Sequence, residues 1–280
     1  MTRSKWTEKK ITAMLKEGRG SGSLADYMPW IRVEEVSSLG RMRRVWSAKT
    51  GRYCHLLSDV EFRLFLALEW QLHIIDIREQ YPLDRNLTQD IARSLGIRHP
   101  HYPGTNIPAV MTVDFLVTQV VGGENVLVAY NAKRDEEAEE ETSILKLEIQ
   151  RTYFEQIGLA HHAVYHSQIP EANVANIGDI REATLKPNEV EPRPGYFASL
   201  TARMAMEIGS ADPKISLRDY CNQFDSRFGA STGVGIRVAR MLMHERILIP
   251  NLAAFDLTAE PLSAFLVKSQ RPQLRAVGGM

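Results

Sequence analysis

Cysteine is scarce in this chain of 280 residues, since only Cys54 and Cys221 are present. They lie far apart and outside any CxxC spacing, so neither a zinc site nor a disulfide framework is indicated. Apolar runs stay well short of the roughly 18 residues that span a bilayer, and the N-terminus is polar, without a signal segment. We therefore expect a cytoplasmic protein with no membrane partner.

Charge of either sign is also not in excess, because 34 Lys and Arg balance 34 Asp and Glu. The distribution is uneven, however, with 12 basic and 5 acidic residues among the first 55. Such a basic region can neutralise phosphates and make binding salt-dependent. We predict DNA contacts from its densest part, although a solvated strand face remains the alternative; the residues are Arg41, Arg43, Arg44, Lys49 and Arg52.

Two carboxylates and a lysine stand out between residues 58 and 133. Glu61 falls in the first turn of an expected apolar helix over 59–72, and Asp114 interrupts an apolar strand. Lys133 closes the next strand. Glu61 also fits a capping box with Ser58, which would give it a purely structural role. A carboxylate within an apolar strand is harder to explain structurally, because its burial is costly without a partner or metal.

The two apolar runs 111–117 and 126–132 predict a β-hairpin around the glycines at 122 and 123. With Gly123 and Glu124 as the central turn residues, Asp114 faces Lys133. Directly opposed residues share a face of the hairpin, roughly 5 Å apart at Cβ. This register places Asp114, Asn131 and Lys133 on one face, unless a bulge shifts it.

This constellation suits Mg²⁺-dependent cleavage of a phosphodiester. Mg²⁺ held by carboxylates neutralises charge at phosphorus and activates water, and it keeps several of its own waters. The expected ligands are Glu61 and Asp114, with Asn131 contributing through its side chain or its backbone carbonyl. Lys133 would orient or deprotonate the water, or hold the phosphate. Mn²⁺ is expected to substitute for Mg²⁺.

The sequence resembles the TnsA endonucleases of heteromeric cut-and-paste transposons, within the PD-(D/E)xK nuclease superfamily. The resemblance covers roughly residues 15 to 165 and rests on the strings EGRGSG (17–22), DYMPW (26–30), LLSDVE (56–61), LEW (68–70), DIREQYP (76–82), TVDF (112–115) and NAK (131–133). It implies that Glu61, Asp114 and Lys133 are the catalytic residues. Asn131 departs from the Gln common in the family and from the carboxylate of the wider superfamily, so a second metal position is in doubt.

The same resemblance implies a function. The protein would cleave the 5′ ends of a transposon, on double-stranded DNA, while a TnsB-like DDE recombinase cuts the 3′ ends. A TnsC-like AAA+ ATPase would be a further partner. Two alternatives remain: a catalytically weak or inactive nuclease-fold subunit that binds DNA and partners, which Asn131 favours, and a free-standing restriction or repair nuclease.

Periodicity predicts an α/β fold with a restriction-endonuclease-like mixed sheet flanked by helices. Helices are expected over 6–17, 59–72 and 89–95, with another after the acidic run at 135. Strands are expected over 31–36, 43–47, 74–77 and 159–165, in addition to the hairpin. These elements form a nuclease domain over 1–168, which includes the basic N-terminal region.

A linker is expected over 169–195, where proline is frequent, with room for a short helix in its middle. A small helix-turn-helix domain, winged-helix-like, is expected over 196–266, with wing strands at 246–249 and 253–257. Its third helix carries Arg237 and Arg240 as candidate DNA contacts, although docking to protein remains open. Residues 267–280 are expected to form a mobile tail.

Overall fold

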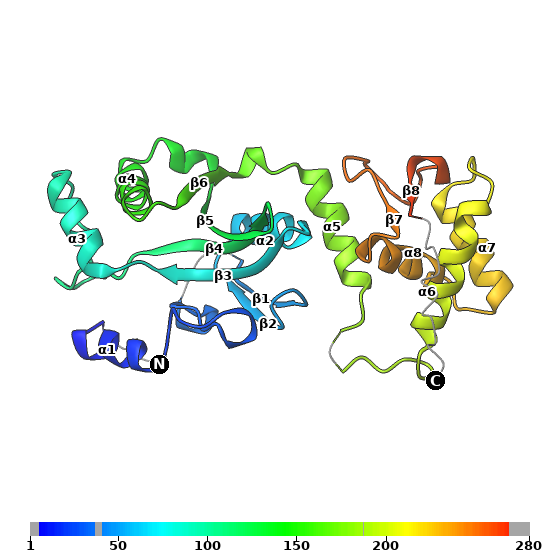
Figure 1. Cartoon of the computed structure of the whole chain (residues 1–280), viewed down its shortest axis with the longest axis horizontal. Helices are drawn as coiled ribbons and strands as arrows, with labels where there is room; N and C mark the ends of the chain where they lie inside the picture. Colours follow the sequence, from blue (N-terminus) through cyan, green and yellow to red (C-terminus); the bar gives the residue numbers. More distant parts are fainter. Residues whose placement is uncertain (1–5, 37–40, 187, 269–280) are drawn as a thin grey trace, which may run out of the picture. The chain divides into compact units, whose positions relative to one another are not determined.

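The computed structural model describes residues 6–36, 41–186 and 188–268 (Figure 1). Most of the expected tail lies outside the described residues. The chain divides into two compact units, Met1–Ile169 and Pro170–Met280. Within the described ranges, no helix is both long and apolar enough to cross a membrane.

The first unit contains a four-stranded mixed sheet in the order β3-β4-β5-β6. Its strands are β3 (Ile74–Pro82), β4 (Thr112–Val121), β5 (Glu124–Lys133) and β6 (Ala160–Tyr165). β3, β4 and β5 pair antiparallel, whereas β5 and β6 run parallel. The β5–β6 crossover needs a helix, and α4 (Glu141–Gln156) supplies it after a short 3-10 turn over Asp135–Ala138. The predicted mixed sheet flanked by helices is confirmed and fits a nuclease-like fold.

Helices pack against this sheet through apolar side chains. On α2 (Asp59–Trp70), Phe65 lies 6.5 Å from Phe115 of β4, measured between ring centroids. A second cluster of buried side chains joins α4 and α3 (Arg85–Ser94) to the sheet, with Leu116 and Ile149 among its members. Because Phe115 and Leu116 are neighbours on a strand, they point to opposite faces. Both faces of the sheet are therefore covered.

The β4–β5 hairpin forms, but its register differs from the predicted one. Val121 pairs with Glu124, so the turn is Gly122–Gly123, and Phe115 pairs with Tyr130. Both glycines have positive φ, at 60° and 90°, as a two-residue hairpin turn of type I′ requires. Continuing this register sets Asp114 opposite Asn131, not opposite Lys133. The shift is two residues, so the shared face is retained.

The N-terminal part adds α1 (Glu8–Lys16) and a separate hairpin of β1 (Arg43–Ser47) and β2 (Arg52–Leu56). The strand predicted over 31–36 is wrong, because Val33–Glu35 forms a 3-10 turn. The Glu35 side chain accepts from the backbone N of Arg32 and forms an ion pair with Arg19 at 2.6 Å. These local bonds compete with extended pairing.

The described part of the second unit consists mainly of four α-helices: α5 (Glu171–Ala183), α6 (Tyr196–Glu207), α7 (Leu217–Phe228) and α8 (Val234–His244). Helix α5 occupies part of the span predicted as a linker. Its residues Val174, Ile177 and Ile180 are buried at helical spacing, so it belongs to the core of this unit. The prolines that suggested a linker flank this helix and do not interrupt it.

A small antiparallel sheet follows α8, formed by β7 (Leu248–Ile249) and β8 (Leu266–Val267). The predicted second strand at 253–257 is wrong, because those residues form turns. Before α8, the buried Asp225 accepts hydrogen bonds from the backbone N of Gly233 at 2.8 Å and of Gly235 at 2.6 Å. A Cβ at Gly235 would lie 2.6 Å from the carbonyl oxygen of Cys221, so glycine permits the close approach of α7 and α8. The winged-helix assignment itself stays a prediction.

Candidate active site

Glu61 is a buried carboxylate in the first turn of α2, and the predicted capping box does not form, because its side chain accepts from the backbone N of Leu57 and not from that of Ser58. Ser58 caps α2 by accepting from the backbone N of Glu61 at 3.1 Å. The Oε2 atom of Glu61 accepts from the backbone N of Leu57 at 2.9 Å and from Nε2 of Gln80 at 3.1 Å. Only 6% of the residue is exposed. Burial, and then the nearby Asp114 carboxylate, raise the pKa of Glu61 to about 8.

Asp114 enters the same site from β4. Its Oδ2 accepts from the backbone N of Ala132 at 2.8 Å and from Nδ2 of Asn131 at 3.4 Å. Burial raises the pKa of Asp114, while the ammonium group of Lys133 opposes that rise. Each carboxylate therefore stands in an environment that disfavours its charge, and a cation between the two would relieve this cost.

Lys133 lies at the end of β5, beside the carboxylates. Its Nζ forms an ion pair with Oε2 of Glu137 at 3.1 Å. Burial alone would lower the pKa of Lys133, but Asp114 and Glu137 raise it above its ordinary value. Lys133 is thus an ammonium cation at neutral pH in this arrangement, suited to holding a phosphate oxygen more than to removing a proton.

The side chain of Asn131 is only 2% exposed, and both ends of its amide are engaged. Its Oδ1 lies 2.7 Å from Nε2 of His161 on β6. The His161 ring stacks on Phe154, and its burial, with the neighbouring His162, lowers the pKa of His161 to about 4. Since an amide oxygen only accepts, the neutral imidazole carries its hydrogen on Nε2. The backbone carbonyl of Asn131 is therefore the better of its two predicted ligand groups.

Gln80 and His161 have no distinctive local signal in the sequence, and Glu137 reads only as part of the acidic run at 135. Gln80 belongs to β3, and its neighbours read only as an ordinary strand. His161 lies in an expected strand beside His162, and nothing in that pattern marks it as a site residue. Only the pairing of β3 with β4 and of β6 with β5 shows which side chains reach Asp114 and Asn131.

The site offers few groups that could hold Mg²⁺. Among the described residues, no group of three or more His, Cys, Asp or Glu is arranged to hold a metal ion. The site instead offers two carboxylates, Glu61 and Asp114, together with a backbone carbonyl. Mg²⁺ prefers oxygen ligands and retains several waters, so this sparse set fits it.

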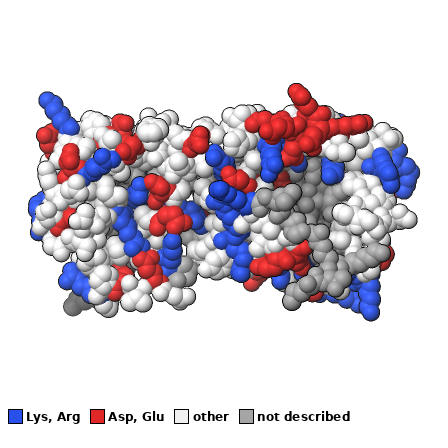
Figure 2. All heavy atoms as spheres, turned by 180° about the vertical axis from the view of Figure 1, so that it is seen from behind, with Lys and Arg blue, Asp and Glu red and all other residues white. Residues whose placement is uncertain are grey.

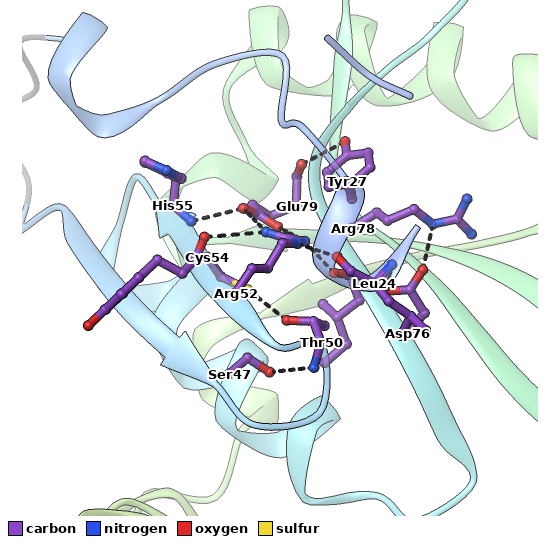
Figure 3. Close-up of polar contacts among 12 residues, drawn as sticks. Leu24, Tyr27, Ser47, Thr50, Arg52, Cys54, His55, Asp76, Arg78 and Glu79 are labelled. Atoms are coloured by element: carbon purple, nitrogen blue, oxygen red, sulfur yellow. Dashed lines mark hydrogen bonds and ion pairs between the residues drawn. The ribbon is translucent and has the colours of Figure 1, made fainter. Parts of the chain in front are cut away.

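Arg52 does not face solvent, contrary to the prediction of a DNA contact. Its guanidinium group points toward the carboxylate of Glu79 (Figure 3). The Nη1 and Nη2 atoms of Arg52 donate to Oε1 and Oε2 of Glu79 at 2.8 and 2.6 Å. Arg52 also donates to the carbonyl oxygens of Leu24 and Ile77, and Glu79 accepts from the backbone N of His55. Arg52 is 8% exposed and Glu79 is fully buried, so this ion pair joins β2 to β3 inside the protein.

The other predicted basic residues lie nearer the surface. Arg41 and Arg44 are exposed, and Arg44 lies 3.6 Å from Glu34 and over the ring of Tyr53. Arg43 forms an ion pair with Asp59. Lys49 donates to the backbone carbonyls that follow the end of α2, at Gln71 and Ile74.

In the second unit, the arginines of α8 contact this unit's own acidic residues. Arg237 binds Glu189 at 2.6 Å, and Arg240 forms an ion pair with Asp179 of α5. On the face drawn in Figure 2, Lys and Arg side chains are interspersed with Asp and Glu. The DNA contacts predicted for Arg237 and Arg240 stay predictions and would require these ion pairs to open.

Comparison with known proteins agrees with the geometry of the first unit. Residues 71–166 match the family model for the TnsA-like endonuclease N terminal domain. The chain is 44% identical over 153 residues to the transposon Tn7 transposition protein TnsA of Escherichia coli, which covers 55% of each chain. The chain thus matches about half the length of this curated relative. The predicted resemblance to TnsA-type transposon endonucleases is confirmed.

Proposed function

We propose, from this TnsA-like endonuclease domain, that the protein is the Mg²⁺-dependent DNA endonuclease subunit of a heteromeric cut-and-paste transposase. The observation that carries the proposal is the convergence of two charge-disfavoured carboxylates, Glu61 and Asp114, with the Lys133 ammonium group. A purely structural role for Glu61 would need only its hydrogen bond from the backbone N of Leu57, not a second carboxylate beside it.

Each residue of the site has a separate role in the proposed reaction. Mg²⁺ or Mn²⁺ bound by Glu61 and Asp114 would neutralise charge at phosphorus and lower the pKa of a bound water. Lys133 binds a non-bridging phosphate oxygen, and its ion pair with Glu137 keeps it charged and in place. Asn131 holds Asp114 through Nδ2 and offers its backbone carbonyl as a further oxygen ligand.

The biological setting follows from the Tn7 relative, whose name describes a transposition protein. In the proposed role, the protein cleaves the 5′ ends of a transposon on double-stranded DNA, and a TnsB-like DDE recombinase cuts the 3′ ends. A TnsC-like AAA+ ATPase is the partner proposed for the second unit.

A nicking assay on transposon-end DNA, with and without the recombinase, tests this function. Asp114→Ala should abolish Mg²⁺-dependent nicking while the protein stays folded in a thermal melt. Asp90→Ala is the matched control, because Asp90 is exposed on α3 and pairs with Arg93 of its own helix. Full activity in folded Asp114→Ala protein would remove this site from the mechanism.

One observation favours a second candidate, a nuclease-fold subunit with little or no activity of its own. Asn131 is neutral where the wider superfamily often has a carboxylate, and its side-chain oxygen is engaged by His161. This subunit would bind transposon-end DNA in the presence of Mg²⁺ and leave both strands intact, even when the recombinase is added.

A further inference from the structure

Gln80 has a backbone conformation that is unusual for its place in the sheet. It lies in β3 between Glu79, which pairs with Phe115, and Tyr81, which pairs with Val113. This register sets it opposite Asp114. Its φ is 48°, in the left-handed region that residues other than glycine rarely adopt in a strand. Such conformations persist where the surrounding structure fixes them, and they gather at functional sites.

Contacts on both sides of the residue hold it in this conformation. The carbonyl oxygen of Gln80 accepts from the backbone N of Trp30 at 3.2 Å, so it is turned toward the N-terminal segment. The residue is 3% exposed, and its side chain reaches Glu61, donating from Nε2 to Oε2 at 3.1 Å. Its Oε1 accepts from Oγ1 of Thr112 at 3.3 Å. Both ends of the amide are thus held.

These contacts place Gln80 between the two expected metal ligands. Glu61 is on α2 and Asp114 is on β4, so no backbone ladder fixes one carboxylate relative to the other. Gln80 is opposite Asp114 in the sheet and hydrogen-bonded to Glu61 through its side chain. The amide also keeps Oε2 of Glu61 occupied, together with the backbone N of Leu57.

We propose that Gln80 is a positioning residue that sets the orientation of the Glu61 carboxylate relative to Asp114, so that both bind one divalent cation. The inference rests on the proposed function, because it concerns the same site. Groups that orient metal ligands typically change metal affinity by roughly 10- to 100-fold when removed. The position should therefore control metal affinity more than stability.

The test uses Gln80→Gly in the full-length protein. Glycine adopts a φ of 48° without strain, so the variant removes the amide and keeps the backbone path. Mn²⁺ binding is measured by the loss of the free-ion EPR signal, and folding by the thermal midpoint. We expect Mn²⁺ to bind about tenfold more weakly or worse, and the Mg²⁺ concentration for half-maximal nicking to rise in parallel.

Leu24→Gly is the matched control, because Leu24 also has a positive φ, at 49°, but its side chain is 45% exposed. It should leave Mn²⁺ affinity unchanged. Gln80→Asn retains an amide that is one methylene too short and tolerates the left-handed region. Gln80→Asn should also weaken Mn²⁺ binding, and it replaces Gln80→Gly in the test if that variant fails to fold.

Asp114→Ala separates the two hypotheses. Loss of Mn²⁺ binding in Asp114→Ala, with unchanged binding in folded Gln80→Gly or Gln80→Asn, overturns the role of Gln80 alone. Unchanged Mn²⁺ binding in folded Asp114→Ala overturns the site and the role of Gln80 together.

Discussion

Nε2 of His161 lies 2.7 Å from Oδ1 of Asn131, and the same amide donates from Nδ2 to Asp114 at 3.4 Å. A histidine on β6 is thereby linked to a carboxylate on β4 through one side chain of the strand between them. The histidine is neutral, because its burial lowers its pKa to about 4. The link fixes which end of the Asn131 amide faces Asp114.

Asn131→Asp should convert this neutral contact into an ion pair. A carboxylate beside the imidazole favours the protonated ring, so the pKa of His161 should rise from about 4. The measurement is an NMR titration of the His161 ring protons in the absence of metal. Asn131→Ala removes the contact without adding charge and is the control. A pKa of His161 that is the same in both variants would contradict the contact.

Glu61 should make the metal-free protein less stable as pH rises. Its pKa in the folded state is about 8, against an ordinary value of 4.5. The folded state therefore holds this proton more tightly, and the resulting stability is complete below the unfolded pKa and is lost as pH rises through the folded one. Each pKa unit corresponds to about 1.4 kcal/mol, so the loss is several kcal/mol at most.

Glu61→Gln removes this titration, so its free energy of unfolding should fall less between pH 5 and 9 than that of the parent. Urea unfolding in EDTA across this range measures the difference. Glu148→Gln is the control, because Glu148 pairs with Arg151, which lowers its pKa and keeps it ionised throughout. Parallel pH profiles of Glu61→Gln and the parent would refute the shift.

Arg52→Ala should lower the free energy of unfolding. It leaves the fully buried Glu79 carboxylate without its partner, which typically costs about 3–5 kcal/mol. Arg151→Ala on the exposed face of α4 should cost far less, because exposed ion pairs are screened by solvent and contribute little. Denaturant unfolding measures both. The double variant Arg52→Met with Glu79→Met should recover part of the loss, because no buried charge is then left alone.

The three arginines at the start of β1 give a separate prediction. Replacing Arg41, Arg43 and Arg44 with alanine should weaken DNA binding about equally across sequences. Each lost phosphate contact should lower the slope of log affinity against log salt by about one. Arg93→Ala on α3 is the control, since Arg93 is exposed but lies in another part of the unit. An unchanged slope in the triple variant would show that these residues do not bind phosphate.

Sequence reasoning found the carboxylates and the lysine because each stands out locally, as a charge within an apolar strand or at a helix start. The face shared by Asp114, Asn131 and Lys133 was also predicted correctly, although the register was not. Moving the turn by one residue shifts the strand pairing by two, and because side chains alternate with a period of two, the partners change while the faces are kept. The Gly122–Gly123 pair was available as the better turn signal.

The features that the sequence did not predict depend on contacts between segments far apart in the chain. Arg52 appears in the sequence as one more residue of a basic cluster, and only the approach of β2 to β3 brings Glu79 to it. Gln80 acquires its conformation from Trp30, which is 50 positions earlier in the numbering. The prolines on either side of α5 favoured a linker over a helix of this length. Its buried apolar residues, three positions apart, are nevertheless a helical pattern in the sequence.

Glu79 and Gln80 are adjacent in β3, yet Glu79 binds Arg52 and Gln80 binds Glu61. This adjacency has an evolutionary consequence. A lineage that loses Arg52 cannot keep Glu79 unchanged without an isolated buried charge, and an altered strand at 79 would disturb the residue that contacts Glu61. Homologues are therefore expected to change positions 52 and 79 together or to retain both, even though neither residue belongs to the catalytic set.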